Sequence, residues 1–436
     1  MLLFYRLSRE FHTLKSIMLE RINLHSLWEK FPTATQIYAD ARLITTITLC
    51  GKLVEARIHG SGGIRVSDKD SVRLTTDLSQ CSLPALKPPI NEETLGQITS
   101  RVRQLFPENK RIIHRKVVLT LTTHLFEVAL PGQAVQQGEE ESASLNIEWG
   151  IQEKEEVQHH REVAARRNWK DLLEDLAPCR WLSERIEQSL KPLPVWPVPN
   201  GEIPVYWAPR AVAKICLPFL RSFEGDRLLS GNSCLNRWTE KEPLPFALEE
   251  QPRTAIDHEG FPTRTVLLFD GRRPRALLVD RHLAEAFSVD STGHARRHSY
   301  RNKNEVLSWG IEIHSQGEAL PSFPEWGLSV RDVDLLDFDP VTAFVSLRLK
   351  DARLLHQGKE GESIEPMVLQ IPLLELLRSW RAFSSETQIY GEFLQKDGAA
   401  YLTEVKAPAA LSPCVRLPGQ VPPEHYWVLC HDDTLS

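Results

Sequence analysis

A proline-rich segment near the middle of the sequence limits how this 436-residue chain can fold. Residues Lys191–Pro209 read KPLPVWPVPNGEIPVYWAP, which is typical of an extended interdomain linker or edge segment, because proline fixes φ and removes a backbone donor. The chain also exceeds the roughly 250–300 residues at which a single hydrophobic core usually stops growing. We therefore predict an α+β protein of two domains, residues 1–195 and 196–436.

The N-terminal domain is predicted to be of the α/β type, with a small sheet and flanking helices. Strands are expected where β-prone residues cluster, at Leu43–Cys50, Leu53–His59, Ile64–Val66 and Val117–Leu130. Helical periodicity predicts helices at Glu92–Leu105 and, as one or two long helices, at Ile151–Leu190. Two connections are also expected, a bulge or tight turn at Gly60–Gly63 and an exposed charged loop at Gln136–Ser144.

Charge and composition exclude several classes of protein. The net charge of −6 does not favour binding of nucleic acid, and no apolar run reaches the ~18 residues of a transmembrane helix. The seven cysteines are scattered and form no CxxC pair, which favours free thiols in a cytoplasmic protein. Residues 1–17 lack the pattern of a secretory signal, and the sequence leaves open whether they are disordered or precede a translation start at Met18.

The C-terminal domain is predicted to be mainly antiparallel β after one initial helix. Pro209 suits the first position of that helix. Apolar side chains then recur at helical spacing, at Val212, Ile215, Phe219 and Phe223. Short strands are expected to follow, with turns at Asp270-Gly271 and Asp397-Gly398 and one late helix at Pro372–Trp380.

The stretch Thr254–Gly310 combines several polar loops with β-prone residues. We expect an acidic loop around Asp257, and then a hairpin with strands at Thr263–Phe269 and Ala276–Val279 and the turn Asp270-Gly271 at its tip. A short helix at Arg281–Phe287 is expected to lead into a second polar loop. That loop reads Ser291-Thr292-Gly293-His294-Ala295, and its glycine can adopt positive φ.

This order of elements resembles the TldD/PmbA family, the peptidases once called modulators of DNA gyrase, whose second member is also called TldE. The matching residues are Asp257, Glu259, Gly260, Thr263, Asp270-Gly271 and Ser291-Thr292-Gly293-His294-Ala295. The resemblance implies a heterodimer of two related chains that encloses a chamber for unfolded or short peptides, with the metal supplied by the TldD-type chain. It also implies candidate residues for a peptide groove or subunit interface: Asp257, Glu259, Gly260, Thr292, Gly293, His294 and Arg296. For the acidic loop, a purely structural role that caps the turn stays open beside the groove.

The metal ligands of TldD-type chains are not matched in this sequence. In those chains the helix after the linker carries His-Glu-x-x-x-His, which can chelate zinc and position a general base, and a later cysteine completes the site. The corresponding positions here are Cys216, Leu217, Arg221 and Tyr390, and no histidine occurs between residues 203 and 252. The resemblance is therefore closest to the metal-free TldE/PmbA-like member. No cofactor is expected in this chain, and zinc is expected in a TldD-like partner.

The sequence thus predicts a non-catalytic subunit of a TldD-type zinc metallopeptidase complex, inactive when isolated. The alternative is a non-enzymatic homodimeric scaffold or peptide-binding protein with the same fold. Catalysis by other residues is a third hypothesis, for which the sequence offers the His294 and His298 pair, Ser291 with His294, and the tail Cys430-His431-Asp432-Asp433. The peptide substrate, the partner, the choice between homodimer and heterodimer, and any connection to gyrase stay open.

Overall fold

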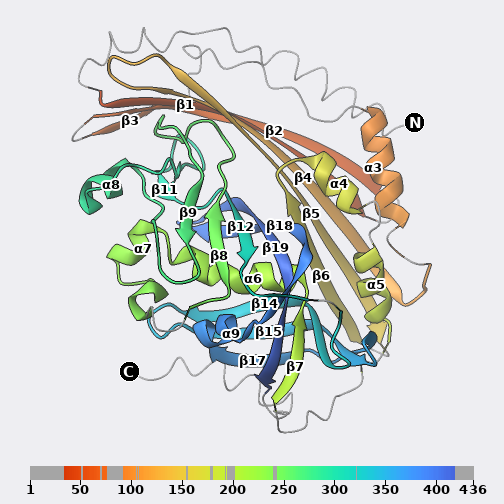
Figure 1. The fold of residues 1–436 in the computed structure, drawn as a ribbon. Coiled ribbons are helices and arrows are strands. Elements are labelled where there is room, and N and C mark those ends of the chain that lie inside the picture. Colours follow the sequence, from red (N-terminus) through yellow and green to blue (C-terminus); the bar gives the residue numbers. More distant parts are fainter. Residues whose placement is uncertain are drawn as a thin grey trace, which may run out of the picture.

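The fold is that of a strand-rich α+β protein (Figure 1). The computed structural model describes residues 34–50, 53–68, 71–75, 92–104, 106, 108–153, 156–176, 180–191, 193, 202–238, 243–320 and 322–417. Within these ranges, 17 strands are linked by hydrogen bonds into one branched sheet, and a further pair forms a small separate ladder. The predicted fold class, a mainly antiparallel α+β protein, is confirmed.

The N-terminal half is built on long antiparallel strands that cross the top and right of Figure 1. The strands are β1 (Gln36–Cys50), β2 (Leu53–Ser67), β3 (Val72–Thr75), β4 (Ile112–Ala129), β5 (Gln136–Glu153) and β6 (Glu156–Arg166). Three helices accompany them, α3 (Glu92–Gln104), α4 (Trp169–Leu176) and α5 (Arg180–Gln188). Alternate apolar residues such as Leu119 and Ile147 face a core that also includes Ile98 of α3 and Ile186 of α5.

The C-terminal half surrounds the buried helix α6, which lies near the centre of Figure 1. Its elements up to residue 287 are β7 (Glu202–Trp207), α6 (Pro209–Arg221), α7 (Gly225–Leu229), a 3-10 turn (Cys234–Arg237), β8 (Phe246–Glu250), β9 (Val266–Phe269) and α8 (Arg281–Phe287). The later elements are β10 (Ala295–Arg296), β11 (Glu305–Val306), β12 (Gly310–Ser315), β13 (Glu318–Ala319), β14 (Trp326–Asp339), β15 (Phe344–His356), β16 (Lys359–Ile364), β17 (Met367–Pro372), α9 (Leu373–Ser379), β18 (Ala382–Lys396) and β19 (Ala399–Arg416). The α6 side chains Val212, Ile215 and Phe219 are fully buried, so this helix joins the surrounding strands into one core.

Predictions that rested on local signals agree with the structure. Helix α6 begins at Pro209, and α3, α8 and α9 fall within about a residue of their predicted bounds. Asp397 and Gly398 both have positive φ in the turn between β18 and β19, and Gly293 adopts φ +73°. These features depend on proline, glycine and apolar spacing, which act over a few residues.

Three N-terminal predictions are wrong. The charged residues Gln136–Ser144 form the first half of β5, where alternate side chains face solvent. Gly60–Gly63 is not a turn but lies inside the continuous strand β2, opposite β1. Residues Ile151–Leu190 are not one or two long helices, because β6 occupies 156–166 and pairs with β5 before the two short helices α4 and α5.

The hairpin predicted in Thr254–Gly310, the motif stretch, is confirmed at its turn but wrong in its return strand. The chain reverses at Asp270-Gly271, and Phe269 bridges Pro274 in antiparallel orientation. Strand β9 pairs with β8 rather than with residues 276–279. Asp270 accepts hydrogen bonds from the backbone N–H groups of Arg272 and Arg273, both at 2.8 Å, so the segment turns into a loop. Leu278 then bridges to Glu224, which attaches this loop to the end of α6.

Several predictions concern residues outside the described ranges. They include those for residues 1–17, for 192 and 194–201 of the linker, and for the tail Cys430-His431-Asp432-Asp433. The described end of the predicted linker is neither a linker nor an edge segment, because it forms β7, which pairs with β14 on one side and β19 on the other. The domain boundary at 195/196 stays a prediction, although β6 and β18 are joined through Ala165 and Gly391. Among the described helices, none is long and apolar enough to span a membrane.

Candidate functional site

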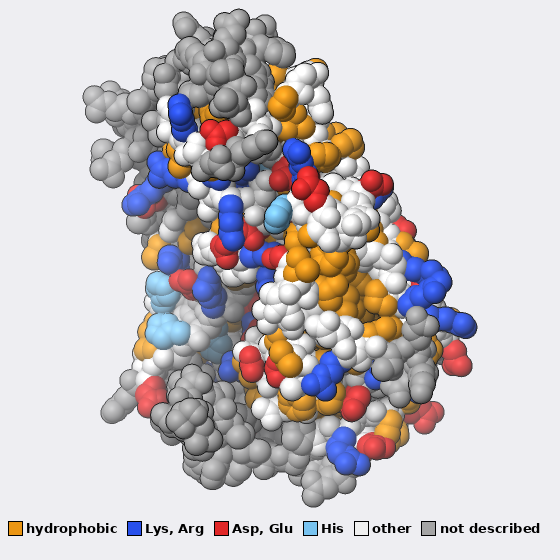
Figure 2. Space-filling view, turned by 90° about the vertical axis from the view of Figure 1, so that its left-hand side faces the viewer, with side chains coloured by type: hydrophobic (Ala, Val, Ile, Leu, Met, Phe, Trp, Pro, Cys, Tyr) orange, Lys and Arg blue, Asp and Glu red, His pale blue; other side chains and the backbone are white. Residues whose placement is uncertain are grey.

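Charged and aromatic side chains meet where the motif stretch packs on the N-terminal sheet. Successive strand residues alternate between faces, so Tyr38, Asp40 and Arg42 of β1 share one face. The sheet–loop cluster, as we call it, consists of Tyr38, Asp40, His124, Phe126 and Glu140 from the sheet and of His258, Arg296, Arg297 and Trp309 from the motif stretch. Figure 2 shows one face of the molecule, on which acidic and basic side chains lie around a hollow. The residues of the cluster are buried, except for Glu140.

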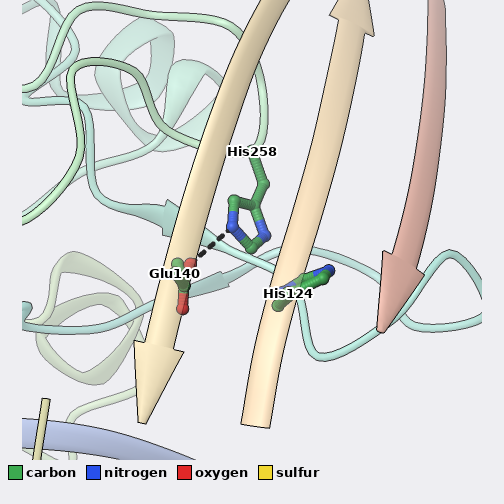
Figure 3. Close-up of side chains that lie close together, drawn as sticks. All are labelled: His124, Glu140 and His258. Atoms are coloured by element: carbon green, nitrogen blue, oxygen red, sulfur yellow. Dashed lines mark ion pairs between the residues drawn. The ribbon is translucent and has the colours of Figure 1, made fainter. Parts of the chain in front are cut away.

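His258 and Glu140 form the central contact of this cluster (Figure 3). The Nε2 atom of His258 lies 2.6 Å from Oε1 of Glu140, while its Nδ1 accepts a hydrogen bond of 2.7 Å from the backbone N–H of Arg297. A ring nitrogen that accepts cannot carry the proton, so the neutral imidazole is protonated at Nε2 and faces the carboxylate. Burial lowers the pKa of His258 to about 4, which keeps the ring neutral at pH 7.

Glu140 is held as a carboxylate by two loop side chains. Burial alone would raise its pKa, but the Nε2–H of His258 and the cation of Arg296 outweigh burial and hold the pKa well below its usual range. Arg296 donates from Nη1 to the backbone oxygens of Ser308 and Leu402 at 2.8 and 2.9 Å, and its Nη2 lies 3.5 Å from Glu140. Its guanidinium also stacks over Trp309, with 4.4 Å to the ring centroid.

Asp40 and His124 complete the sheet side of the cluster. The Nε2 atom of His124 lies 3.3 Å from Oδ2 of Asp40 and 3.4 Å from the hydroxyl of Tyr38. The same carboxylate oxygen accepts a hydrogen bond of 2.8 Å from the backbone N–H of Tyr300. Asp40 therefore fastens the motif stretch to β1.

Among the described residues, His124, Glu140 and His258 are grouped closely enough to be tested as metal ligands, since their ligand atoms lie within 4.8 Å of one another. A histidine that binds a metal normally donates the N–H of its other ring nitrogen to a second group. His258 shows the opposite arrangement, because its Nδ1 accepts from Arg297 and leaves the proton on Nε2. The cation of Arg296 beside Glu140 further disfavours a second cation. His258 and Glu140 therefore fit a close acid–imidazole contact, and the three residues do not fit a metal centre.

The predicted acidic loop is organised by Asp257. Its Oδ1 accepts hydrogen bonds from the backbone N–H groups of Glu259 and Phe261, both at 2.9 Å, and its Oδ2 accepts from Ala295 at 3.2 Å. Burial raises the pKa of Asp257 to about 7, with Glu259 acting in the same direction. Gly260 closes the turn at φ +82°. The loop is thus tied to the second polar loop through one buried carboxyl group.

The second polar loop is fixed by equally specific contacts. Thr292 Oγ1 accepts a hydrogen bond of 2.8 Å from the backbone N–H of Val279. A Cβ atom on Gly293 would lie 2.5 Å from the backbone oxygen of Pro262, so only glycine fits there. His294 is fully buried, and its Nε2 lies 3.4 Å from Oε1 of Glu250.

The seven predicted groove or interface residues thus lie on or next to the two polar loops, which Asp257 joins through its contact with Ala295. Six of the seven are buried within the chain, Glu259 being the exception. Their role in binding substrate or a partner stays a prediction. Sequence reasoning missed His124, Glu140, His258 and Arg297. His124 is a polar residue inside the β-prone run Val117–Leu130, whereas Glu140 lies in a charged run that is typical of a loop. His258 and Arg297 lie inside or beside the matched motifs.

The positions that correspond to the TldD ligands lie elsewhere, on α6 and β18. Cys216 and Leu217 are buried in the core, and burial raises the pKa of the Cys216 thiol. Arg221 pairs with the buried Glu224 at 3.2 Å, while Tyr390 lies on β18. Leucine offers no ligand atom and a guanidinium is cationic, so these side chains do not fit zinc.

Glu224 is bound by further cations. Arg227 lies 2.9 Å and Lys396 lies 3.2 Å from its carboxylate. Lys396 also pairs with Asp226 at 2.7 Å and donates to the backbone oxygen of Val306 at 2.8 Å. The Glu224-Gly225-Asp226 end of α6 is thus occupied by the chain's own basic side chains.

Comparison with known proteins agrees with the resemblance noted in the sequence. Residues 200–412 match the family model described as PmbA/TldA metallopeptidase C-terminal domain. No curated protein sequence gives a significant match.

Solved structures share the fold over nearly the whole chain. TldE from Thermococcus kodakarensis has a TM-score of 0.68 at 17% identity, covering 91% of this chain and 99% of its own. A candidate modulator of DNA gyrase from Bacteroides thetaiotaomicron has a TM-score of 0.67 at 14% identity, with coverages of 89% and 96%. A second such protein, from Thermotoga maritima, has a TM-score of 0.68 at 14% identity, with coverages of 93% and 99%. Residues 200–412 thus match a domain of the PmbA/TldA metallopeptidase family, and the whole chain shares the fold of these solved structures.

Proposed function

We propose that this chain is the non-catalytic, TldE/PmbA-like subunit of a TldD-type zinc metallopeptidase complex that acts on unfolded or short peptides. The observation that carries the proposal is the state of α6. At the two histidine positions of a TldD-type chain, this helix has the core residue Cys216 and an Arg221 that pairs with Glu224. Leu217 stands where those chains have the general-base glutamate. A catalytic zinc site needs three protein ligands and an open position, so the metal has to come from a related partner chain.

The remaining part of the proposal concerns what the chain contributes to such a complex. The two polar loops are fixed by buried contacts of Asp257 and Gly293. These contacts can hold the neighbouring surface in one shape for a peptide or a partner. Main-chain hydrogen bonds to exposed strand edges would then bind an extended peptide with little dependence on its side chains. A folded substrate could not offer such a segment.

The experiment is co-expression of this chain with a TldD-like protein from the same source, followed by a peptide-cleavage assay. We expect the isolated chain to be inactive and the complex to cleave unfolded peptides. Removing a zinc-ligand histidine of the partner should abolish cleavage, whereas Cys216→Ala in this chain should leave it intact, because Cys216 is a core residue here. An isolated chain that cleaves peptides would contradict the proposal. A stable homodimer that binds peptides but has no TldD-like partner would instead establish the scaffold alternative.

A further inference from the structure

Arg297 is a buried cation without an anionic partner among the described residues. Its exposure is 3%, and it forms no ion pair with any carboxylate of the described residues. The Nε and Nη1 atoms have no hydrogen-bond partner, and Nη2 has only a long contact of 3.5 Å with Oε1 of Gln36. Buried charges in proteins are nearly always paired, because an uncompensated one is costly. Arg297 therefore has unused capacity to bind an anion.

A second arginine without an ion pair among the described residues, Arg65, lies near Arg297. Arg65 of β2 stands directly opposite Tyr38 of β1, and the guanidinium of Arg297 lies 4.2 Å from the centroid of the Tyr38 ring. Arg65 also makes no ion pair in the described part of the chain. Its Nε has no partner, and Nη1 makes only a long hydrogen bond of 3.4 Å to the backbone oxygen of Asn302. Arg65 is half-buried, whereas Arg297 is buried.

The charges of the two arginines are not cancelled by their surroundings. Burial lowers the pKa of Arg297 to about 10, with the neighbouring cation of Arg65 acting in the same direction. Two nearby carboxylates attract Arg297 without forming an ion pair with it. Glu259 accepts from the backbone N–H of Arg281 and the side-chain amide of Asn304, at 2.9 and 2.8 Å. The Oδ2 atom of Asp40 accepts from Tyr300, and its buried Oδ1 has no hydrogen-bond partner.

We propose that Arg65 and Arg297 bind an oxyanion. A guanidinium presents planar, paired N–H donors that match the two oxygens of a carboxylate or phosphate, and here the Nε edges of both arginines are unused. The free C-terminal carboxylate of a peptide is the source that the proposed function would supply, and the inference rests on that function for this source only. Inorganic phosphate offers the same chemistry as a free ion.

The test measures binding and thermal unfolding of the full chain with three probes: inorganic phosphate, a short peptide with a free C-terminus, and the same peptide amidated. We expect phosphate and the free peptide to raise Tm by at least about 2 °C at saturating concentration. The amidated peptide should bind at least about tenfold more weakly than the free one, since it lacks the carboxylate. Phosphate should also compete with the free peptide. Binding of phosphate alone would still establish the oxyanion site, with a free ion as its ligand.

The variants are Arg297→Met, Arg297→Lys and Arg348→Gln. Arg297→Met should weaken anion binding at least about tenfold while the protein stays folded, because it removes an uncompensated buried charge. Arg297→Lys keeps the charge but not the fork, and should bind with intermediate affinity. Arg348 is exposed on β15, so its variant removes the same charge and should bind like the original chain. If all three bind alike, or if the chain shows no response to any probe, the proposal is overturned.

These outcomes are separable from those of the proposed function. A complex that cleaves free and amidated peptides equally, with a chain that binds no anion, would remove the oxyanion site and leave the subunit role intact. Anion binding that depends on Arg297, without peptidase activity of any complex, would leave the site and remove the subunit role.

Discussion

In two regions of this molecule, buried charged side chains differ in whether they have partners of opposite charge. At the end of α6, the carboxylate of Glu224 is surrounded by Arg221, Arg227 and Lys396, all within 3.2 Å. Beside β1 and β2, the guanidiniums of Arg65 and Arg297 have no carboxylate partner within the described residues. The first region corresponds to the place of the metal in TldD-type chains, and the second lies against the motif loops.

The difference shows which region can still take a ligand. Where acidic and basic side chains already neutralise one another, a metal or anion would have to displace a formed ion pair and leave a buried charge behind. Where cations are left with free donors, a ligand adds partners without removing any. We therefore expect no metal or anion to bind at the end of α6. We expect a ligand to bind beside Arg65 and Arg297 instead.

The largest expected effect tests the saturated region. Glu224→Gln leaves three cations around a neutral side chain and should lower the free energy of unfolding by about 3–5 kcal/mol. Urea unfolding followed by circular dichroism would measure the loss. The matched control is Glu285→Gln, which removes an exposed partner of Arg281 and should leave stability unchanged. A Glu224 variant as stable as its control would mean that the two regions do not differ.

The next largest effect is expected at Gly293 in the second polar loop. Gly293→Ala places a Cβ 2.5 Å from the backbone oxygen of Pro262 at φ +73°, so it should cost about 2–3 kcal/mol. Gly398→Ala has nearly the same φ, +75°, but open space around it, and should cost only about 1 kcal/mol. Equal losses in urea midpoint would show that close packing at Gly293 is unimportant.

The pH dependence of stability provides a third test, through Asp257. Its folded pKa of about 7 lies above the ordinary 3.8, so the folded state holds this proton more tightly than the unfolded state. Stability from this group is present at low pH and is lost as pH rises from about 4 to 7, by about 2 kcal/mol between pH 5 and 6.5. Asp257→Asn should remove that slope. An identical slope in the variant, measured by urea midpoints across this range, would assign the dependence to other groups.

The smallest effect is expected at the His258 and Glu140 pair. Glu140→Gln keeps an oxygen to accept from Nε2 of His258 but loses the attraction to Arg296, and should cost about 1–2 kcal/mol at pH 7. The folded pKa of His258, about 4, is below its ordinary 6.5, so its contribution runs opposite to that of Asp257 and rises with pH between these values. His258→Gln should flatten this rise in urea midpoints. A steeper rise in the variant would contradict a neutral His258.

Local sequence signals predicted the parts of the fold that depend on nearby residues. Pro209 and the apolar spacing after it defined α6, and Asp397-Gly398 defined a turn. The strand character of Gln136–Ser144 was missed because one face of that strand is exposed and therefore charged, like a loop. Gly63 was misread because its cause is non-local. A Cβ there would lie 2.4 Å from the ring of Tyr300, more than 200 residues later in the chain.

The candidate site shows the same limit. Asp257 and Gly293 could be found from the sequence because their neighbours in the chain make the motif. Glu140 and His124 acquire their environment only when β4 and β5 pair in register and His258 reaches them from more than 100 residues away. The missing partners of Arg65 and Arg297 are also a property of the folded chain, since acidic residues are plentiful in the sequence.

The central claim is that this chain has no metal site of its own, neither at α6 nor at His124, Glu140 and His258. Equilibrium dialysis of the purified chain against zinc, followed by metal analysis, tests it most directly. We predict far less than one zinc per chain, unchanged in Cys216→Ala and in His258→Gln. Stoichiometric zinc that is lost in either variant would contradict the account and locate the metal in the region where that residue lies.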